Sequence, residues 1–126
     1  MEKLGTTIEF NLNEGKKLEC LSERYLVFKE GFVWDTIKRR PVKFFDVGNG
    51  YLSARLQSPI AKHHTGTRHF KLYRLVAMAF LDGFREDLTI DHKDFNKSNN
   101  HITNLECVTL KENIRRYHEK RRSIIK

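Results

Sequence analysis

The feature that most constrains the fold is a change in hydrophobic pattern near residue 71. Up to that point, short apolar runs are separated by turn residues, as in antiparallel strands. Beyond it, apolar residues recur at the spacing of one helix face: Leu72, Leu75, Val76, Ala79 and Phe80. The pattern predicts an α+β fold, in which a strand-rich N-terminal region leads into a helix that belongs to the core.

Four short antiparallel strands are expected in the N-terminal region, at residues 25–28, 32–34, 42–45 and 51–56. The turns between them are marked by Glu30-Gly31, Arg40-Pro41 and Gly48-Asn-Gly50. Residues 57–68 are expected to form a loop, in which His63 and His64 are adjacent. Such a pair can bind a metal ion, but in a polar loop it more often has no ligand.

The second half of the chain has the order strand, loop, strand, helix. Strands are expected at 88–92 and 105–108, joined by the Asn-rich loop 93–103. Thr109 and Glu112 have the spacing of a capping box, so a final helix should begin near Leu110. We expect residues 1–70 and 71–126 to be two parts of one compact unit.

The charge of the chain favours a polyanionic partner. Its 126 residues include 24 Lys and Arg against 16 Asp and Glu, which gives a net charge of +8 and a pI near 9.7. Such a partner is a nucleic acid or an acidic membrane surface, and no run of about 18 apolar residues is present that could span a membrane. Cys20 and Cys107 are far apart in sequence, so neither a disulfide framework nor a cysteine zinc site is expected.

Four polar residues in the second half point to phosphodiester hydrolysis: Asp91, His92, Asn104 and Asn113. The reaction needs a group that takes a proton from water, and a histidine, which ordinarily titrates near pH 6.5, suits this task. It also needs a hard cation such as Mg²⁺, for which a carboxylate and an amide oxygen are suitable ligands. Neighbours in a strand point to opposite faces, so Asp91 and His92 can serve separate tasks.

Residues 72–117 resemble the HNH endonucleases of phages and introns, which have a ββα-metal fold. The resemblance rests on LYRLVAMAF and on TIDHKDFNKSNNHITNLECVTLKENIRR, in which the polar residues precede a capped helix in the family's order. It implies that His92 is the general base and that Asp91 and Asn113 hold one Mg²⁺ or Mn²⁺ ion, with no zinc. Asn104 would fix the loop and so orient His92. Many members have histidine where this chain has Tyr73, so Tyr73 is given no role.

The resemblance also implies double-stranded DNA as the partner. The final helix ends the chain with a strong excess of cations, and four of them are expected to contact phosphates: Lys111, Arg115, Arg116 and Arg122. Arg74 is a further candidate, although a structural ion pair explains it equally well. Residues 1–70 are a weaker candidate for contact with a DNA groove.

Two other functions stay open. The chain could occupy DNA through an HNH scaffold without cutting it, although no motif residue is missing. It could instead bind RNA, although it lacks an aromatic RNP pattern. As a nuclease with one site per chain, it is expected to nick DNA as a monomer or to cut both strands as a homodimer. A phage or mobile element would encode it, and it would act in the cytoplasm of a bacterial host.

Overall fold

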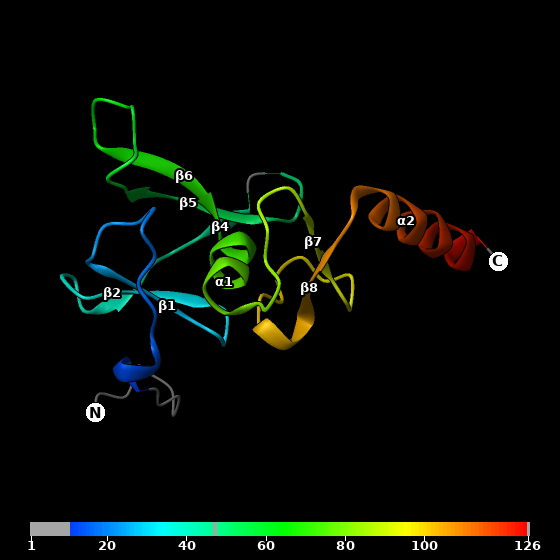
Figure 1. Cartoon of the computed structure of the whole chain (residues 1–126), viewed down its shortest axis with the longest axis horizontal. Helices are drawn as coiled ribbons and strands as arrows, with labels where there is room; N and C mark the ends of the chain where they lie inside the picture. Colours follow the sequence, from blue (N-terminus) through cyan, green and yellow to red (C-terminus); the bar gives the residue numbers. More distant parts are fainter. Residues whose placement is uncertain (1–10, 47, 126) are drawn as a thin grey trace.

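The computed structural model describes residues 11–46 and 48–125, with side chains described up to residue 119. Three small antiparallel sheets surround a central helix, α1 (Leu72–Phe80), and a second helix, α2 (Leu110–Ile125), extends away from them (Figure 1). The fold is therefore α+β, as the sequence predicts. None of the described helices has the length and apolar character needed to cross a membrane.

The first sheet is a hairpin with a short third strand. It contains, in this order, β1 (Tyr25–Phe28), β2 (Phe32–Asp35) and β3 (Arg40–Pro41). The first two strands pair from Tyr25 opposite Asp35 to Phe28 opposite Phe32, close to their predicted bounds. A short 3₁₀ turn, η1 (Leu12–Glu14), precedes the sheet.

The second sheet contains β4 (Phe45–Asp46), β5 (Leu52–Gln57) and β6 (Thr67–Lys71). The single strand predicted at 42–45 is wrong. Val42 donates its N–H to the Val33 carbonyl of the first sheet at 2.8 Å, whereas Phe45 pairs with Ser53 of the second. The apolar run is divided between two sheets, and a hydrophobic pattern does not reveal a change of partner.

Strand β6 shortens the loop that was predicted at 57–68. Its residues pair with β5 from Thr67 opposite Gln57 to Lys71 opposite Ser53. Most side chains of β6 are polar and exposed, so the strand has no apolar alternation that sequence reasoning could detect. Pairing with β5 therefore imposes the strand on this segment.

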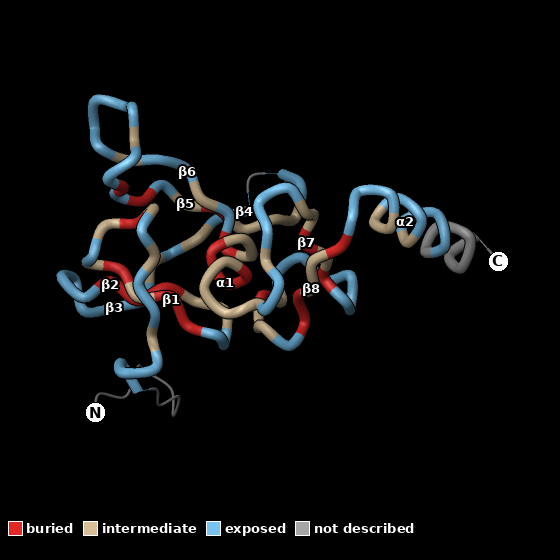
Figure 2. The backbone as a smooth tube through the Cα atoms, in the orientation of Figure 1, coloured by how far each residue is buried: buried red, intermediate tan, exposed pale blue. Residues whose placement is uncertain are grey.

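Helix α1 joins the two halves of the chain. Its buried side chains are Leu72, Leu75, Val76 and Ala77. The helix packs against β1, β2, β5 and β6 from the first half and against two strands of the second. Buried backbone of β1 and β2 lies close to α1 in Figure 2. One apolar cluster thus extends from Val27 in the first sheet to Leu105 in the last.

The last part of the chain forms a ββα unit. Strands β7 (Thr89–His92) and β8 (Leu105–Val108) are antiparallel, and a 3₁₀ turn, η2 (Ile102–Asn104), lies between them. Helix α2 begins at Leu110, as predicted, and the N–H of Glu112 donates to Thr109 Oγ1 at 3.2 Å. The helix contacts β7 and then leaves the body of the molecule (Figure 1).

A buried ion pair connects the ends of β1 and β2. Arg24 Nη2 lies 2.6 Å from Asp35 Oδ2, and the two side chains are 14% and 7% exposed. Asp35 Oδ1 also accepts the N–H groups of Ile37 and Lys38. Burial by itself raises the pKa of Asp35, but these hydrogen bonds and the Arg24 charge together hold it below its ordinary value.

Asp35→Asn is expected to lower the free energy of unfolding by about 3 kcal/mol at neutral pH, because it leaves the buried Arg24 unpaired. The pKa of Asp35 is lower in the folded than in the unfolded state. Its contribution is therefore complete above about pH 4 and is lost as the pH falls further. Urea unfolding of both proteins at about pH 7 and about pH 3 measures this effect. If the two proteins differ in free energy of unfolding by the same amount at both pH values, the predicted role of the Asp35 charge is wrong.

Candidate active site

Strand β7 ends at two residues that carry the predicted chemistry. Asp91 and His92 line a pocket of about 330 Å³, and Asn113 from the first turn of α2 lines the same pocket. The remaining lining residues are Tyr51, Ile90, Phe95, Lys97, Arg116 and Tyr117. The fold therefore brings together a histidine, a carboxylate and an amide that were selected from the sequence.

The His92 imidazole is buried, with 4% of the residue exposed. Its Nε2 lies 2.8 Å from Asn100 Oδ1, while Asn100 Nδ2 lies 3.4 Å from the Ser98 carbonyl oxygen. With the amide in this orientation, its oxygen faces the imidazole and can only accept a hydrogen bond. Nε2 of a neutral His92 thus carries the proton, and Nδ1 is left as the basic atom. Nδ1 has no hydrogen-bond partner among the described residues.

Sequence reasoning gave no role to Asn100, because it is one of several asparagines in a loop where asparagine commonly forms turns. The buried contact with His92 distinguishes it. Asn104, which was expected to fix the loop and so orient His92, bonds to residues of that loop and not to His92 itself. Its Oδ1 accepts the N–H of Asp94 at 3.0 Å, and its Nδ2 donates to Asp94 Oδ1 and to the Asn99 carbonyl. An effect of Asn104 on His92 therefore passes through the loop.

The backbone turns sharply after His92. The N–H of Phe95 donates to the His92 carbonyl at 2.9 Å, and Phe95 has a φ of +63°. This left-handed conformation is uncommon for a bulky residue and costs on the order of 1 kcal/mol. Hydrogen bonds on both sides of Phe95, at Asp94 and Asn96, help to offset the cost.

The first hairpin packs against the same loop. The N–H of Ile102 donates to the Lys29 carbonyl at 2.7 Å. Gly31 has a φ of +101°, and a Cβ there would lie 2.8 Å from the Asn100 carbonyl carbon. Glycine is therefore required at this turn for its conformation and for the close approach of two backbones.

Asp91 and Glu106 lie directly opposite one another on β7 and β8. Like charges at such positions repel, and Arg116 compensates for this. Its Nη1 lies 3.0 Å from Asp91 Oδ2 and also binds Glu106 Oε1, while its Nε lies 3.1 Å from Glu112 Oε1. Hydrogen bonds from Arg115 and Arg116 lower the pKa of Glu112 to about 2.

A divalent cation would find two available oxygen atoms in this pocket. Arg116 binds Asp91 Oδ2, which leaves Asp91 Oδ1 and the Asn113 side-chain amide without partners among the described residues. No group of three His, Cys, Asp or Glu side chains in the described part of the chain could hold a metal ion. A carboxylate and an amide oxygen suit Mg²⁺ or Mn²⁺, which retain water ligands, better than they suit a softer metal.

The cations predicted to contact DNA lie in different surroundings. Lys111 is exposed, whereas Arg115 and Arg116 are bound to Glu112 of their own helix. Arg74 lines a separate depression and lies over a phenyl ring, 5.7 Å from its centre. The side chain of Arg122 lies outside the described residues.

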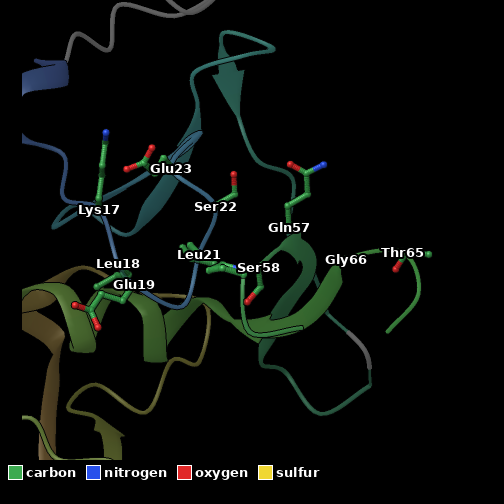
Figure 3. Close-up of a pocket in the computed structure, with 11 residues that line it drawn as sticks. Lys17, Leu18, Glu19, Leu21, Ser22, Glu23, Gln57, Ser58, Thr65 and Gly66 are labelled. Carbon is green, nitrogen blue, oxygen red and sulfur yellow. The ribbon is translucent and has the colours of Figure 1, made fainter. Parts of the chain in front are cut away.

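A wider depression, of about 620 Å³, lies on the strand-rich half of the molecule (Figure 3). It is formed by the segment that precedes β1 and by the loop that follows β5, with Ser22, Gln57 and Ser58 in its lining. None of the predicted catalytic or metal-binding residues lines it. We therefore place the candidate active site in the smaller pocket at the end of β7.

Comparison with known proteins identifies the family of the chain. Residues 75–115 match the sequence profile of the family described as HNH endonuclease. The fold is similar to that of the HNH homing endonuclease I-HmuI, solved in work on DNA binding and cleavage, with a TM-score of 0.67 and 33% identity. This similarity covers 78% of the present chain and 53% of that chain. The chain belongs to the HNH endonuclease family.

Two curated HNH relatives come from phage sources. The DNA endonuclease I-HmuI of Bacillus phage SP01 is 53% identical over 45 residues, which are 36% of this chain and 26% of that protein. The candidate HNH homing endonuclease YosQ of the SPbeta prophage of Bacillus subtilis (strain 168) is 37% identical over 75 residues, which are 60% and 41% of the two chains. The HNH chain described here thus spans less than half the length of these relatives.

Arg116→Gln is expected to tighten divalent-cation binding on the order of fivefold, because it removes a positive charge that competes with the metal ion for Asp91. The Coulomb attraction between two such charges in contact is about 1 kcal/mol in water. Mn²⁺ titration followed by electron paramagnetic resonance measures this affinity. Arg115→Gln is the matched control, since Arg115 lies on the same helix and does not contact Asp91. Weaker binding by Arg116→Gln would show that Asp91 needs Arg116 to keep its position.

Proposed function

We propose that this chain is a metal-dependent endonuclease that hydrolyses phosphodiester bonds of double-stranded DNA. The observation that carries the proposal is the pocket shared by His92, Asp91 and Asn113, with His92 held by the buried Asn100. The names of the relatives, a DNA endonuclease and a candidate homing endonuclease, agree with this activity. The net charge of +8 agrees with a polyanionic substrate.

In the proposed mechanism, His92 Nδ1 takes a proton from the attacking water, while Asn100 holds the protonated Nε2 and so fixes the ring. Asp91 and Asn113 would hold the divalent cation through their free oxygen atoms. A bound Mg²⁺ or Mn²⁺ ion neutralises phosphate charge and stabilises the leaving oxygen. Burial of His92 excludes bulk water from all of the ring except the side that faces the pocket.

Further features of the substrate complex are part of the proposal. Exposed Lys111 of α2 would contact phosphates, and so would Arg74, Arg115, Arg116 and Arg122 once DNA is bound. Arg115 and Arg116 would first have to exchange their carboxylate partners for phosphate. Residues 1–70 would add contacts to one DNA groove. A monomer would nick and a homodimer would cut both strands, in the host cytoplasm where the substrate is found.

His92→Ala is expected to abolish cleavage of supercoiled plasmid and to leave DNA affinity unchanged, because the histidine is buried and serves as the base. The assay compares the two proteins with Mg²⁺, with Mn²⁺ and with EDTA, and gel shifts measure binding.

Two outcomes argue against this mechanism. Undiminished cutting by His92→Ala excludes His92 as the base. Binding without cutting under any metal favours the alternative, a catalytically silent DNA-binding module. The ion pair between Arg116 and Asp91 supports this alternative, because Arg116 already occupies one of the carboxylate oxygens that a metal ion would use.

Asn100→Ala is expected to reduce cleavage by about 10- to 100-fold, because it removes the acceptor that fixes the His92 ring. Asn96→Ala is the control, since Asn96 lies in the same loop, is exposed and does not contact His92. Single-turnover kinetics with saturating protein separate the chemical step from binding. Equal rates for the two variants would show that Asn100 has no part in orienting the base.

A further inference from the structure

The pocket at the end of β7 contains one cation that no carboxylate binds. Two cations line this pocket, Arg116 and Lys97. Arg116 is bound to Asp91 and Glu106, so its charge is compensated. Lys97, in the loop that follows β7, forms no direct ion pair with a carboxylate of the described residues. Asp46 feels its charge from a distance: backbone hydrogen bonds from Gly48 and Gly50 lower the pKa of Asp46, and Lys97 adds to this effect. The positive charge of Lys97 is thus available beside the candidate base.

The strand-rich half of the chain holds Lys97 in place. Its Nζ donates to the Asn49 carbonyl at 2.9 Å and lies 4.5 Å from the centre of the Tyr51 ring. An ammonium group at this distance from an aromatic ring is attracted to it. The side-chain stem crosses Gly50, where a Cβ would lie 3.0 Å from Lys97 Cδ. Residues 49–51 therefore fix both the stem and the head of this lysine.

Tyr51 also connects Lys97 with the candidate base. The centre of its ring lies 6.0 Å from that of His92 and 5.1 Å from that of Tyr73. A second ammonium group, Lys71 Nζ, lies 5.4 Å from the Tyr51 ring. The residue that precedes β5 thus contributes an aromatic surface to a pocket whose other predicted functional groups come from the last third of the chain.

We propose that Lys97 binds a DNA phosphate in the nuclease pocket and that Tyr51 positions it. The inference rests on the proposed function, to which it adds a phosphate-binding residue supported by the strand-rich half. An ammonium group has three donors, and the Asn49 carbonyl uses one, so two remain for phosphate oxygens. A purely structural link to Asn49 would need the hydrogen bond but not the positive charge, and this difference can be tested.

DNA binding is measured first, in EDTA and in a His92→Ala background, so that no cutting is needed. Lys97→Met keeps the stem that crosses Gly50 and removes the charge, while Lys97→Arg keeps the charge. Lys93→Met is the matched control, because Lys93 is exposed in the same loop and does not line the pocket. The slope of log affinity against log salt should fall by about 0.9 in Lys97→Met and should be retained in the other two variants.

Cleavage is measured next, in the native His92 background and with saturating protein. Lys97→Met should reduce the single-turnover rate by about 10- to 100-fold, and Lys97→Arg should restore most of it. Tyr51→Leu should lose part of the same rate, whereas Tyr51→Phe, which keeps the ring, should retain it. Melting temperatures of all variants show whether any loss comes from unfolding.

The outcomes separate this proposal from the proposed function. An unchanged salt slope in Lys97→Met overturns the phosphate contact, and so does a wild type whose DNA binding does not depend on salt. A lower melting temperature with an unchanged slope assigns Lys97 to a structural link. A reduced slope in a protein that never cuts DNA supports the phosphate contact and overturns catalysis.

Discussion

Packing of α1 against strands from both halves of the chain determines where the pocket lies. The helix has few residues, yet Leu75, Val76 and Ala77 are almost completely buried. Each of the three sheets touches it, so the relative position of the sheets depends on one apolar helix face. The end of β7 and Tyr51, which immediately precedes β5, both line the pocket and are positioned by this shared contact.

Within this framework, two charged arrangements meet at the pocket. On one side, Arg116 binds the facing carboxylates of Asp91 and Glu106 and so offsets the repulsion between their two negative charges. On the other, Lys97 lies against Tyr51 without a direct ion pair to a carboxylate of the described residues. The proposed nuclease would have to attract a cation and a polyanion at the same time, and it would need both arrangements, because either charge alone would exclude one of the two ligands.

The sequence predicted the elements that have a strong hydrophobic pattern or cap. Helix α1, the strands of the ββα unit and the start of α2 at Leu110 all follow from such signals. It failed where the partner of a segment decides its structure, as at residues 42–45, which change sheets, and in β6, which is a strand through its pairing with β5. For the site, spacing and family resemblance selected Asp91, His92, Asn104 and Asn113. Asn100 belongs to the motif that carries the family resemblance, but its role became clear only from its contact with His92. Glu106 and Lys97 could not be recognised, since their importance depends on which side chains the fold brings against them.

The contact between Gly31 and the backbone of Asn100 has a consequence for how this nuclease core can be exchanged between proteins. Asn100, which is hydrogen-bonded to the His92 imidazole, packs against the hairpin turn at Gly31 in the first half of the chain. A ββα unit transplanted without that hairpin would lose this support, even with every motif residue present. Recombination between such genes should therefore preserve the turn and the loop together, and chimaeras joined near residue 71 should lose function unless both sides come from the same parent.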